Sequence, residues 1–267
     1  MEESIFRLQR AQRLPAAGAQ FPMADSSSSP LVFVPRQGEP QQLFVLLHGE
    51  GADPAQVVPL ANAIAGTFSQ AVVFLPRAFL AAPEAGQGFH WGLPDHWQTP
   101  SNPHGAVHTV SQLDAQVRKL QQQFALSGQQ TALAGFSHGA SLALEAIQAS
   151  HDLAGRVLAF SGLPALLPRL APPATLIHFL HGEDDTLVPV EDAQFALEHF
   201  AGIEGDVTLD IASGIGHELH ASLIKQAIVR LTTCVPMRSW KEAMQALGKS
   251  SAGSGRLTAI PPDRTVH

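Results

Sequence analysis

Residues 132–144 read ALAGFSHGASLAL and place a Gly-x-Ser-x-Gly pentapeptide between an apolar run and an alanine- and leucine-rich run. A strand, a tight turn and a helix in this order form the nucleophile-elbow pattern. Gly135 and Gly139 suit this pattern, because a side chain at either position would strike the neighbouring strand or helix. Ser137 would then lie at a helix N-terminus, where backbone N–H groups and the helix dipole favour a developing negative charge. The same residues also suit a small-residue turn that only packs a helix against a strand, so the rest of the chain has to decide.

Short apolar runs on both sides of this stretch predict a central sheet. Most of these runs are apolar on both faces, which is typical of parallel strands covered by helices on both sides. The run DVTLDI alternates between polar and apolar residues, and we expect it near an edge of the sheet. The predicted strands are residues 43–48, 71–76, 131–136, 156–161, 175–181 and 206–211.

Helical periodicity separates several of these runs. One apolar stripe over residues 110–124 predicts a helix, with Thr109 as its N-cap and Gly128 at its end. A second stripe runs over residues 219–231 and is closed by Pro236, and a short third one covers residues 237–247. Another helix is expected to begin near Val190. Because strands and helices alternate without a linker, the chain is predicted to form one α/β domain with a mostly parallel sheet.

The two ends of the chain differ in composition from the middle. We expect residues 1–29 to be a disordered N-terminal extension, residues 30–247 to form the α/β domain, and residues 248–267, rich in Gly, Ser and Pro, to be a disordered tail. The segment MADSSSSP that begins at Met23 looks like an independent protein start. Residues 1–22 are therefore predicted to be dispensable.

The overall composition excludes several classes of function. Hydrophobic residues make up 45% and charged residues 15% of the chain, a balance typical of globular enzymes. A net charge of -7 gives no electrostatic reason to expect nucleic acid or an anionic membrane as a partner. No apolar run approaches the roughly 18 residues that cross a bilayer, so we expect no integral membrane association. The single cysteine, Cys234, excludes an internal disulfide and a thiolate metal site, and it fits a reducing compartment. We therefore expect a cytoplasmic protein.

Several predicted strands are followed directly by residues that can act as nucleophile, acid or base. In parallel sheets ligands bind at the edge where the strands end, so these residues are candidates for a site. A nucleophilic serine needs a base, and the base needs an orienting acid, in the chain order Ser, Asp or Glu, His. Asp184 and Asp185 both follow the strand 175–181, and either could be the acid. His217 follows a strand and a glycine loop and precedes a helix, which makes it the candidate base.

The other histidines, of thirteen in total, have plainer interpretations. His178 lies inside an apolar strand and is expected to be a core residue, and His199 belongs to a helix face. His220 ends the sequence HELH, whose histidines are three apart and so do not form the HExxH zinc motif. Four more crowd one segment without Cys, Asp or Glu at metal-ligand spacing, and a metal-dependent hydrolase built on them is the weakest alternative; they are His90, His96, His104 and His108. We expect neither a metal nor a cofactor.

A tetrahedral intermediate requires two N–H donors. One is expected from the backbone of His138, directly after the serine, and the other from the backbone of Glu50, in the loop after the early strand. A glutamate that pointed toward an oxyanion would oppose catalysis, so we expect the Glu50 carboxylate to turn away or to be neutralised. An ion pair between Glu50 and protonated His138 is one way to neutralise it.

Four segments together resemble the phospholipase/carboxylesterase family of small α/β-hydrolases, which includes acyl-protein thioesterases and bacterial carboxylesterases. They are LLHGEGAD (46–53), GFSHG (135–139), HGEDDTLVP (181–189) and GIGHE (214–218). The resemblance covers roughly residues 30 to 247 and is strongest to the small bacterial esterases of the family.

The resemblance implies an α/β-hydrolase fold, with Ser137 as nucleophile, Asp185 rather than Asp184 as acid, and His217 as base. It also implies that the backbone N–H groups of Glu50 and His138 form the oxyanion hole. This chain departs from the family at both of these positions, since members usually have glutamine after the serine and an apolar residue in place of Glu50.

The expected reaction is the hydrolysis of a small-molecule ester or thioester through an acyl-enzyme. Four residues of the segment 86–97 could line an acyl groove or could simply pack a long loop; they are Phe89, Trp91, Leu93 and Trp97. The alternatives are the same triad acting on a lysophospholipid, a protein S-acyl group or a short peptide, and a catalytically silent hydrolase fold used for binding. The protein is expected to be a monomer or a homodimer.

Overall fold

The computed structural model describes residues 30–35, 37–81, 88–92 and 103–234. Their centre is a seven-stranded sheet with the strand order β1-β3-β2-β6-β7-β8-β9. β1 pairs with β3 in antiparallel orientation, and the other neighbours are parallel. The strands are β1 (Leu31–Phe33), β2 (Gln42–Leu47), β3 (Ala71–Leu75), β6 (Thr131–Phe136), β7 (Arg156–Phe160), β8 (Leu176–Gly182) and β9 (Asp206–Ala212). A separate two-stranded ribbon joins β4 (Leu80–Ala81) and β5 (Phe89–His90).

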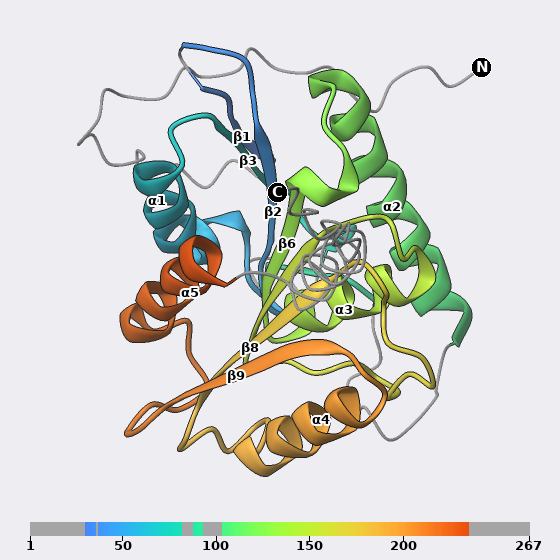
Figure 1. The fold of residues 1–267 in the computed structure, drawn as a ribbon, viewed down its shortest axis with the longest axis vertical. Coiled ribbons are helices and arrows are strands. Elements are labelled where there is room, and N and C mark those ends of the chain that lie inside the picture. The colour runs from blue at the N-terminus through green and yellow to red at the C-terminus, as the bar shows by residue number, and fades with distance from the viewer. Residues whose placement is uncertain (1–29, 36, 82–87, 93–102, 235–267) are drawn as a thin grey trace, which may run out of the picture. The chain divides into compact units, whose positions relative to one another are not determined.

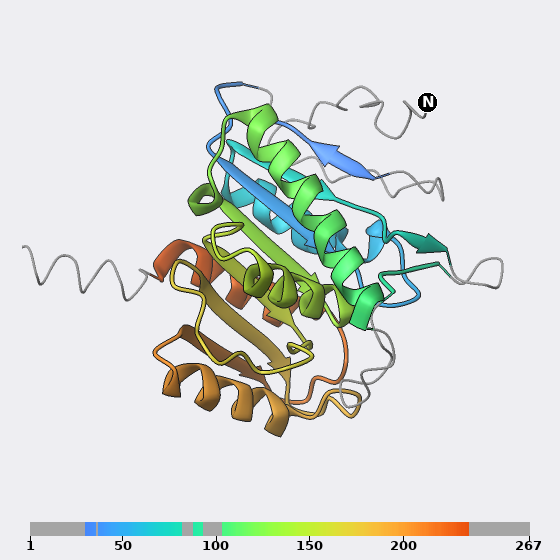
Figure 2. The ribbon, with the colours of Figure 1, turned by 90° about the vertical axis from the view of Figure 1, so that its right-hand side faces the viewer.

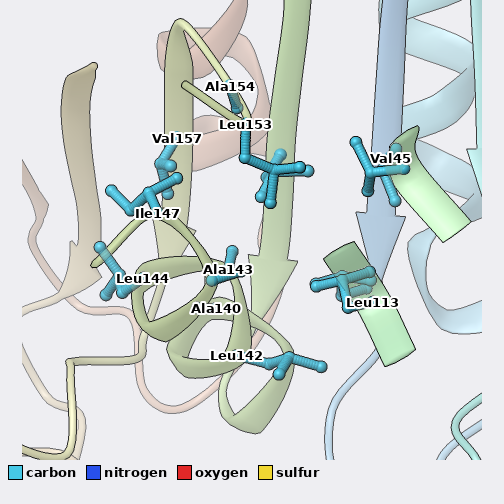
Figure 3. Close-up of a cluster of buried hydrophobic side chains, with 14 of the residues drawn as sticks. Val45, Leu113, Ala140, Leu142, Ala143, Leu144, Ile147, Leu153, Ala154 and Val157 are labelled. Carbon is cyan, nitrogen blue, oxygen red and sulfur yellow. The ribbon is translucent and has the colours of Figure 1, made fainter. Parts of the chain in front are cut away.

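Helices cover both faces of the sheet (Figures 1 and 2). α2 (Pro103–Phe124), α3 (His138–Ala149) and α4 (Val190–Gly202) contribute to one buried apolar layer. α1 (Val58–Thr67) and α5 (Ala221–Thr233) contribute to the other. The inner strands β2, β3, β6, β7 and β8 are buried because each face of the sheet has a helical cover, whereas the edge strand β9 is mostly half-buried. Figure 3 shows the first layer where Leu113 of α2, Leu142 of α3 and Val45 of β2 meet.

The six predicted strands are all present, with bounds that differ by no more than two residues. The alternating run 206–211 forms β9, which lies at the edge of the sheet as predicted. The predicted helices after Ser137 and near Val190 are α3 and α4. β1, α1 and the β4–β5 ribbon were not predicted.

Both ends predicted for the helix over residues 110–124, which is α2, were wrong. α2 begins at Pro103, so Thr109 lies inside the helix, where its hydroxyl donates a hydrogen bond to the Trp91 carbonyl oxygen at 2.6 Å instead of capping. α2 ends at Phe124, before Ala125, whose φ is +53°. Gly128 instead begins a 3-10 turn, Gly128–Gln130, where a Cβ would lie 1.8 Å from the carbonyl oxygen of Asp152.

α5 ends at Thr233, and the predicted closure at Pro236 and the helix over 237–247 lie outside the described residues. The same holds for the predicted N-terminal extension and C-terminal tail. Among the described helices, none is both long enough and apolar enough to span a membrane.

Candidate active site

The serine of the opening stretch lies on a strained turn between β6 and α3. Ser137 has φ +53° and ψ -121°, a conformation that residues with a Cβ seldom adopt. A Cβ at Gly135 would lie 2.3 Å from the backbone of Gly139, and a Cβ at Gly139 would lie 2.4 Å from the Leu47 carbonyl oxygen. Both glycines are therefore required, as predicted, by the close approach of the helix to the sheet.

A continuous hydrogen-bonded line joins the serine to a histidine and an aspartate. His217 Nε2 lies 3.0 Å from Ser137 Oγ, and His217 Nδ1 lies 2.8 Å from Asp185 Oδ2. An ionised carboxylate can only accept, so Nδ1 carries the proton and Nε2 presents a lone pair to the serine hydroxyl. The three side chains follow the carboxyl ends of β6, β8 and β9. The sheet thus brings His217 into contact with Ser137, 80 residues away in sequence, and with Asp185, 32 residues away.

The two candidate acids have different surroundings. The Asp185 side chain is fully buried, and its Oδ1 accepts hydrogen bonds from the amides of Leu187 at 3.0 Å and Val188 at 2.9 Å. Burial alone would raise the pKa of Asp185, but the hydrogen bonds from Val188 and His217 outweigh it and hold this pKa below its ordinary value. Asp184 is exposed, and its amide donates to the Ile215 carbonyl oxygen at 2.9 Å, which ties the acid loop to the histidine loop.

The loop after β2 is held by three side chains that surround the peptide between His48 and Gly49. Gln56 Oε1 accepts the Gly49 amide proton at 2.7 Å, and Trp91 Nε1 donates to the His48 carbonyl oxygen at 2.8 Å. The His48 ring lies with Nδ1 2.8 Å from the Gly49 carbonyl oxygen and accepts the Ala78 amide at Nε2. These contacts fix the direction of the chain just before Glu50, whose backbone is the predicted oxyanion donor.

His48 serves this loop in its neutral form. Its Nε2 accepts a proton from the Ala78 amide, so Nδ1 must donate to the Gly49 carbonyl oxygen. Burial lowers the pKa of His48 and outweighs the hydrogen bond to Gly49 and the charge of Asp53. The ring is therefore a fixed structural connector and not a base.

The side chain of Glu50 is exposed, and its carboxylate lies 3.9 Å from Nδ1 of His90 in the β4–β5 ribbon. A protonated His90 would neutralise it. The ribbon also holds the loop by backbone hydrogen bonds, from the Gly51 amide to the Phe89 carbonyl oxygen and from the Phe89 amide to the Ala52 carbonyl oxygen. The pairing of Glu50 with His138 stays a prediction.

The four residues proposed for an acyl groove have different surroundings. Trp91 is fully buried and packs against His48 and Phe79, so its side chain belongs to the core and offers no surface to a substrate, which corrects the prediction. Phe89 is half-buried beneath the Arg77 guanidinium, 4.6 Å from its ring centre. Leu93 and Trp97 lie outside the described residues.

Three further histidines have local structural contacts. His178 is buried in β8, as predicted, with Nδ1 2.7 Å from Thr208 Oγ1. His199 on α4 contacts the Pro168 carbonyl oxygen, and His220 contacts Ser222 Oγ. His96 and the side chain of His104 lie outside the described part of the chain, within which no group of three or more His, Cys, Asp or Glu could hold a metal ion.

Sequence reasoning missed two residues that support the site. Gln56 reaches Gly49 across a turn of the chain, and nothing in the local sequence marks it. His181, at the end of the predicted strand, lies against Asp185, with Nε2 3.5 Å from Oδ2. Its place at the end of a strand, three residues before the sequence Asp-Asp, was the available signal, because a residue at the carboxyl end of a strand faces the same edge as the acid.

Known proteins resemble most of this chain. A family model described as phospholipase/carboxylesterase matches residues 30–235. Esterase YpfH of Escherichia coli strain K12 is 34% identical over 205 residues, which cover 76% of this chain and 88% of that protein. The crystal structure of esterase PE8 matches with a TM-score of 0.68 and 25% identity, over 78% of this chain and 99% of that one. The carboxylesterase from Mesorhizobium loti matches in fold, with a TM-score of 0.62 and 18% identity over 73% and 90% of the two chains. The chain has the α/β-hydrolase fold and belongs to the phospholipase/carboxylesterase family of carboxylic ester hydrolases.

Proposed function

We propose that the chain hydrolyses carboxylic esters or thioesters through an acyl-enzyme, with Ser137 as nucleophile, His217 as general base and Asp185 as the orienting acid. The observation that carries the proposal is the line of hydrogen bonds from Ser137 Oγ through the two nitrogens of His217 to Asp185. A nucleophile within reach of a base, and a base oriented by a carboxylate, are the parts that acyl transfer needs.

The steps follow from the proton positions. Ser137 Oγ attacks the carbonyl carbon of the substrate as its proton passes to His217 Nε2, and the buried carboxylate of Asp185 stabilises the imidazolium that forms. His217 then gives the proton to the leaving alcohol or thiol, which leaves an acyl group on Ser137. A water molecule repeats the cycle with His217 as base, and releases the carboxylic acid and the free serine.

The negative charge on the carbonyl oxygen needs two fixed N–H donors. The proposed donors are the backbone amides of His138 and Glu50. His138 is the first residue of α3, where amides point out of the helix N-terminus and the helix dipole favours an anion. Glu50 follows the peptide that Gln56, His48 and Trp91 hold in place.

Hydrolysis of p-nitrophenyl esters from acetate to octanoate tests the proposal. The wild-type chain should hydrolyse at least one of them, the rate should resist EDTA, and Ser137→Ala should remove it. Ser111→Ala is the matched control, because Ser111 is exposed on α2 and its hydroxyl donates to the Val107 carbonyl oxygen of the same helix. Inhibition by EDTA would favour a metal-dependent hydrolase, and no hydrolysis of any ester would favour a silent fold.

Two apolar side chains support a substrate with an acyl chain. Leu187, two residues after Asp185, is 72% exposed, and Leu166, in the segment after β7, is 78% exposed. Exposed leucines can cover a hydrocarbon chain, and Leu187 is close in sequence to the proposed acid. A rate that rises from acetate to octanoate would extend the proposal to acyl-protein thioester or lysophospholipid substrates, and a maximum at acetate would restrict it to small esters. The cytoplasm is the proposed location, since the chain has a single cysteine.

A further inference from the structure

Two imidazole rings approach the same oxygen of Asp185. His217 Nδ1 lies 2.8 Å from Oδ2, and Nε2 of His181 lies 3.5 Å from it. His181 is at the end of β8, and its side chain is fully buried. The proposed reaction uses only the His217 ring, so the position of the His181 ring needs its own explanation.

The hydrogen bonds around His181 fix where its proton lies. Nε2 is 2.8 Å from the carbonyl oxygen of Val188, which can only accept, so Nε2 carries the proton. Within the part of the chain that the structure describes, Nδ1 has no hydrogen-bond partner. Burial lowers the pKa of His181, against the raising effects of the Val188 hydrogen bond and the Asp185 charge. The ring is therefore a neutral N–H donor, and it does not compete with His217 as a cation.

Val188 links the two ends of this arrangement. Its amide donates to Asp185 Oδ1 at 2.9 Å, and its carbonyl oxygen accepts from His181. Asp185, Val188 and His181 thus form a closed set of contacts in which each residue touches the other two. Loop amides hold one oxygen of the Asp185 carboxylate, and His181 at the end of β8 lies against the other. The carboxylate therefore has little freedom to rotate away from His217.

We propose that His181 is a positioning residue for the hydrolytic reaction: its Nε2–H holds the Val188 carbonyl and the adjacent Asp185 carboxylate in the orientation that His217 requires. This inference rests on the proposed function of Ser137, His217 and Asp185. His181 does not touch the reacting atoms. It acts through the acid, and misplacement of a catalytic group by about 1 Å can cost about 100-fold in rate.

A set of substitutions at this position separates the donor from the bulk of the ring. Glutamine places an amide N–H where Nε2 lies, asparagine places its amide nearer to Nδ1, and leucine fills the space without a donor. We expect His181→Gln to keep kcat within about threefold of wild type. His181→Asn and His181→Leu should lower kcat about 10- to 100-fold with little change in KM, because the acid serves the reaction and not substrate binding. The substrate is the p-nitrophenyl ester that the wild-type chain hydrolyses fastest.

A spectroscopic readout accompanies the kinetics. The proton between His217 Nδ1 and Asp185 gives a far-downfield proton NMR resonance, which should persist in His181→Gln and broaden or vanish in His181→Asn. The Gln–Asn pair decides the matter even where His181→Leu does not fold, since both are small polar side chains. Equal activity of the Gln and Asn variants, or wild-type kcat in His181→Asn, would overturn the inference.

Asp185→Asn is the reference variant that separates a failure of the inference about His181 from a failure of the proposed triad. If Asp185→Asn loses activity while His181→Asn keeps it, the inference about His181 fails and the proposed triad stands. If Asp185→Asn keeps wild-type activity, the proposed triad itself fails, and the inference about His181 falls with it.

Discussion

The side-chain oxygen of Gln56 lies 2.7 Å from the backbone nitrogen of Gly49, one residue before the proposed oxyanion donor. Gln56 belongs to a 3-10 turn, Pro54–Val57, that Asp53 caps by accepting the Ala55 amide at 2.7 Å. The turn therefore brings a side-chain acceptor back onto the loop that precedes it, and satisfies an amide of that loop which would otherwise be free to reorient.

Gln56→Leu removes this acceptor while it keeps a similar volume. We expect kcat to fall about tenfold or more, because loss of one oxyanion donor costs about 100- to 1,000-fold and loss of its alignment costs part of that. Gln122→Leu is the control, since Gln122 is exposed on α2. Steady-state hydrolysis of a p-nitrophenyl ester measures both, and equal kcat for the two variants would argue against a role of Gln56 in the oxyanion hole.

Gly162, two residues after β7, lies close against the nucleophile turn. A Cβ at Gly162 would lie 2.4 Å from the Ser137 carbonyl oxygen and 2.7 Å from the Cβ of Ala140. Gly162→Ala should therefore displace the turn and lower kcat, and it should also lower the melting temperature. Gly66→Ala is the matched control, because a Cβ there meets no atom within 4 Å, and alanine favours the helix. A Gly162→Ala variant as active as Gly66→Ala would mean that the turn tolerates the displacement.

Asp184 and Asp185 provide an internal comparison for the acid. Asp185→Asn should lower kcat by up to about 10,000-fold, since an amide in place of the carboxylate favours the wrong tautomer of His217. Asp184→Asn should leave kcat close to wild type, because the contact of Asp184 to Ile215 is made by its backbone. Kinetic measurements on the two single variants check this, and the reverse ranking would make Asp184 the acid.

His178 predicts a dependence of stability on pH. Burial, together with the positive charges of Arg156 and Arg230, lowers the pKa of His178 to about 4, although Asp210 opposes this. An unfolded histidine titrates near 6.5, so between pH 6.5 and about 4 the unfolded chain binds a proton that the folded chain does not. The contribution of His178 to the free energy of unfolding is therefore fully present above pH 6.5 and is lost as the pH drops through this window. The loss is roughly 3 kcal/mol at most for this residue.

Urea unfolding at several pH values between 7.5 and 4.5 measures this contribution. His178→Leu should reduce the slope of the unfolding free energy against pH, because the titrating group is gone. Identical slopes for wild type and variant would show that His178 titrates alike in the folded and unfolded chains.

Local sequence patterns were sufficient for the parts of the molecule that depend on local chemistry. The strand runs were visible because parallel strands buried on both faces need uninterrupted apolar residues. The turn at Ser137 was visible because its geometry admits only glycine at positions 135 and 139. The choice between Asp184 and Asp185 was not open to residue chemistry alone, since only the three-dimensional path of the loop decides which carboxylate faces His217.

Other features depend on contacts between distant segments, and these were missed or misjudged. Thr109 has the chemistry of a helix cap, but the carbonyl oxygen of Trp91 takes its hydroxyl inside the helix. For Trp91 the sequence left an acyl groove and loop packing both open, and its indole N–H serves the His48 carbonyl in the core. Gln56 carries no sequence signal of its own, because its value lies in the backbone group that it reaches.

The identity of the nucleophile is the central claim, and mapping the adduct of a fluorophosphonate probe tests it most directly. We predict one phosphonyl group per active chain, found by tandem mass spectrometry on Ser137, and no labelling of Ser137→Ala or of His217→Ala under the same conditions. An adduct on another residue, or an unlabelled chain that still hydrolyses esters, would contradict the account.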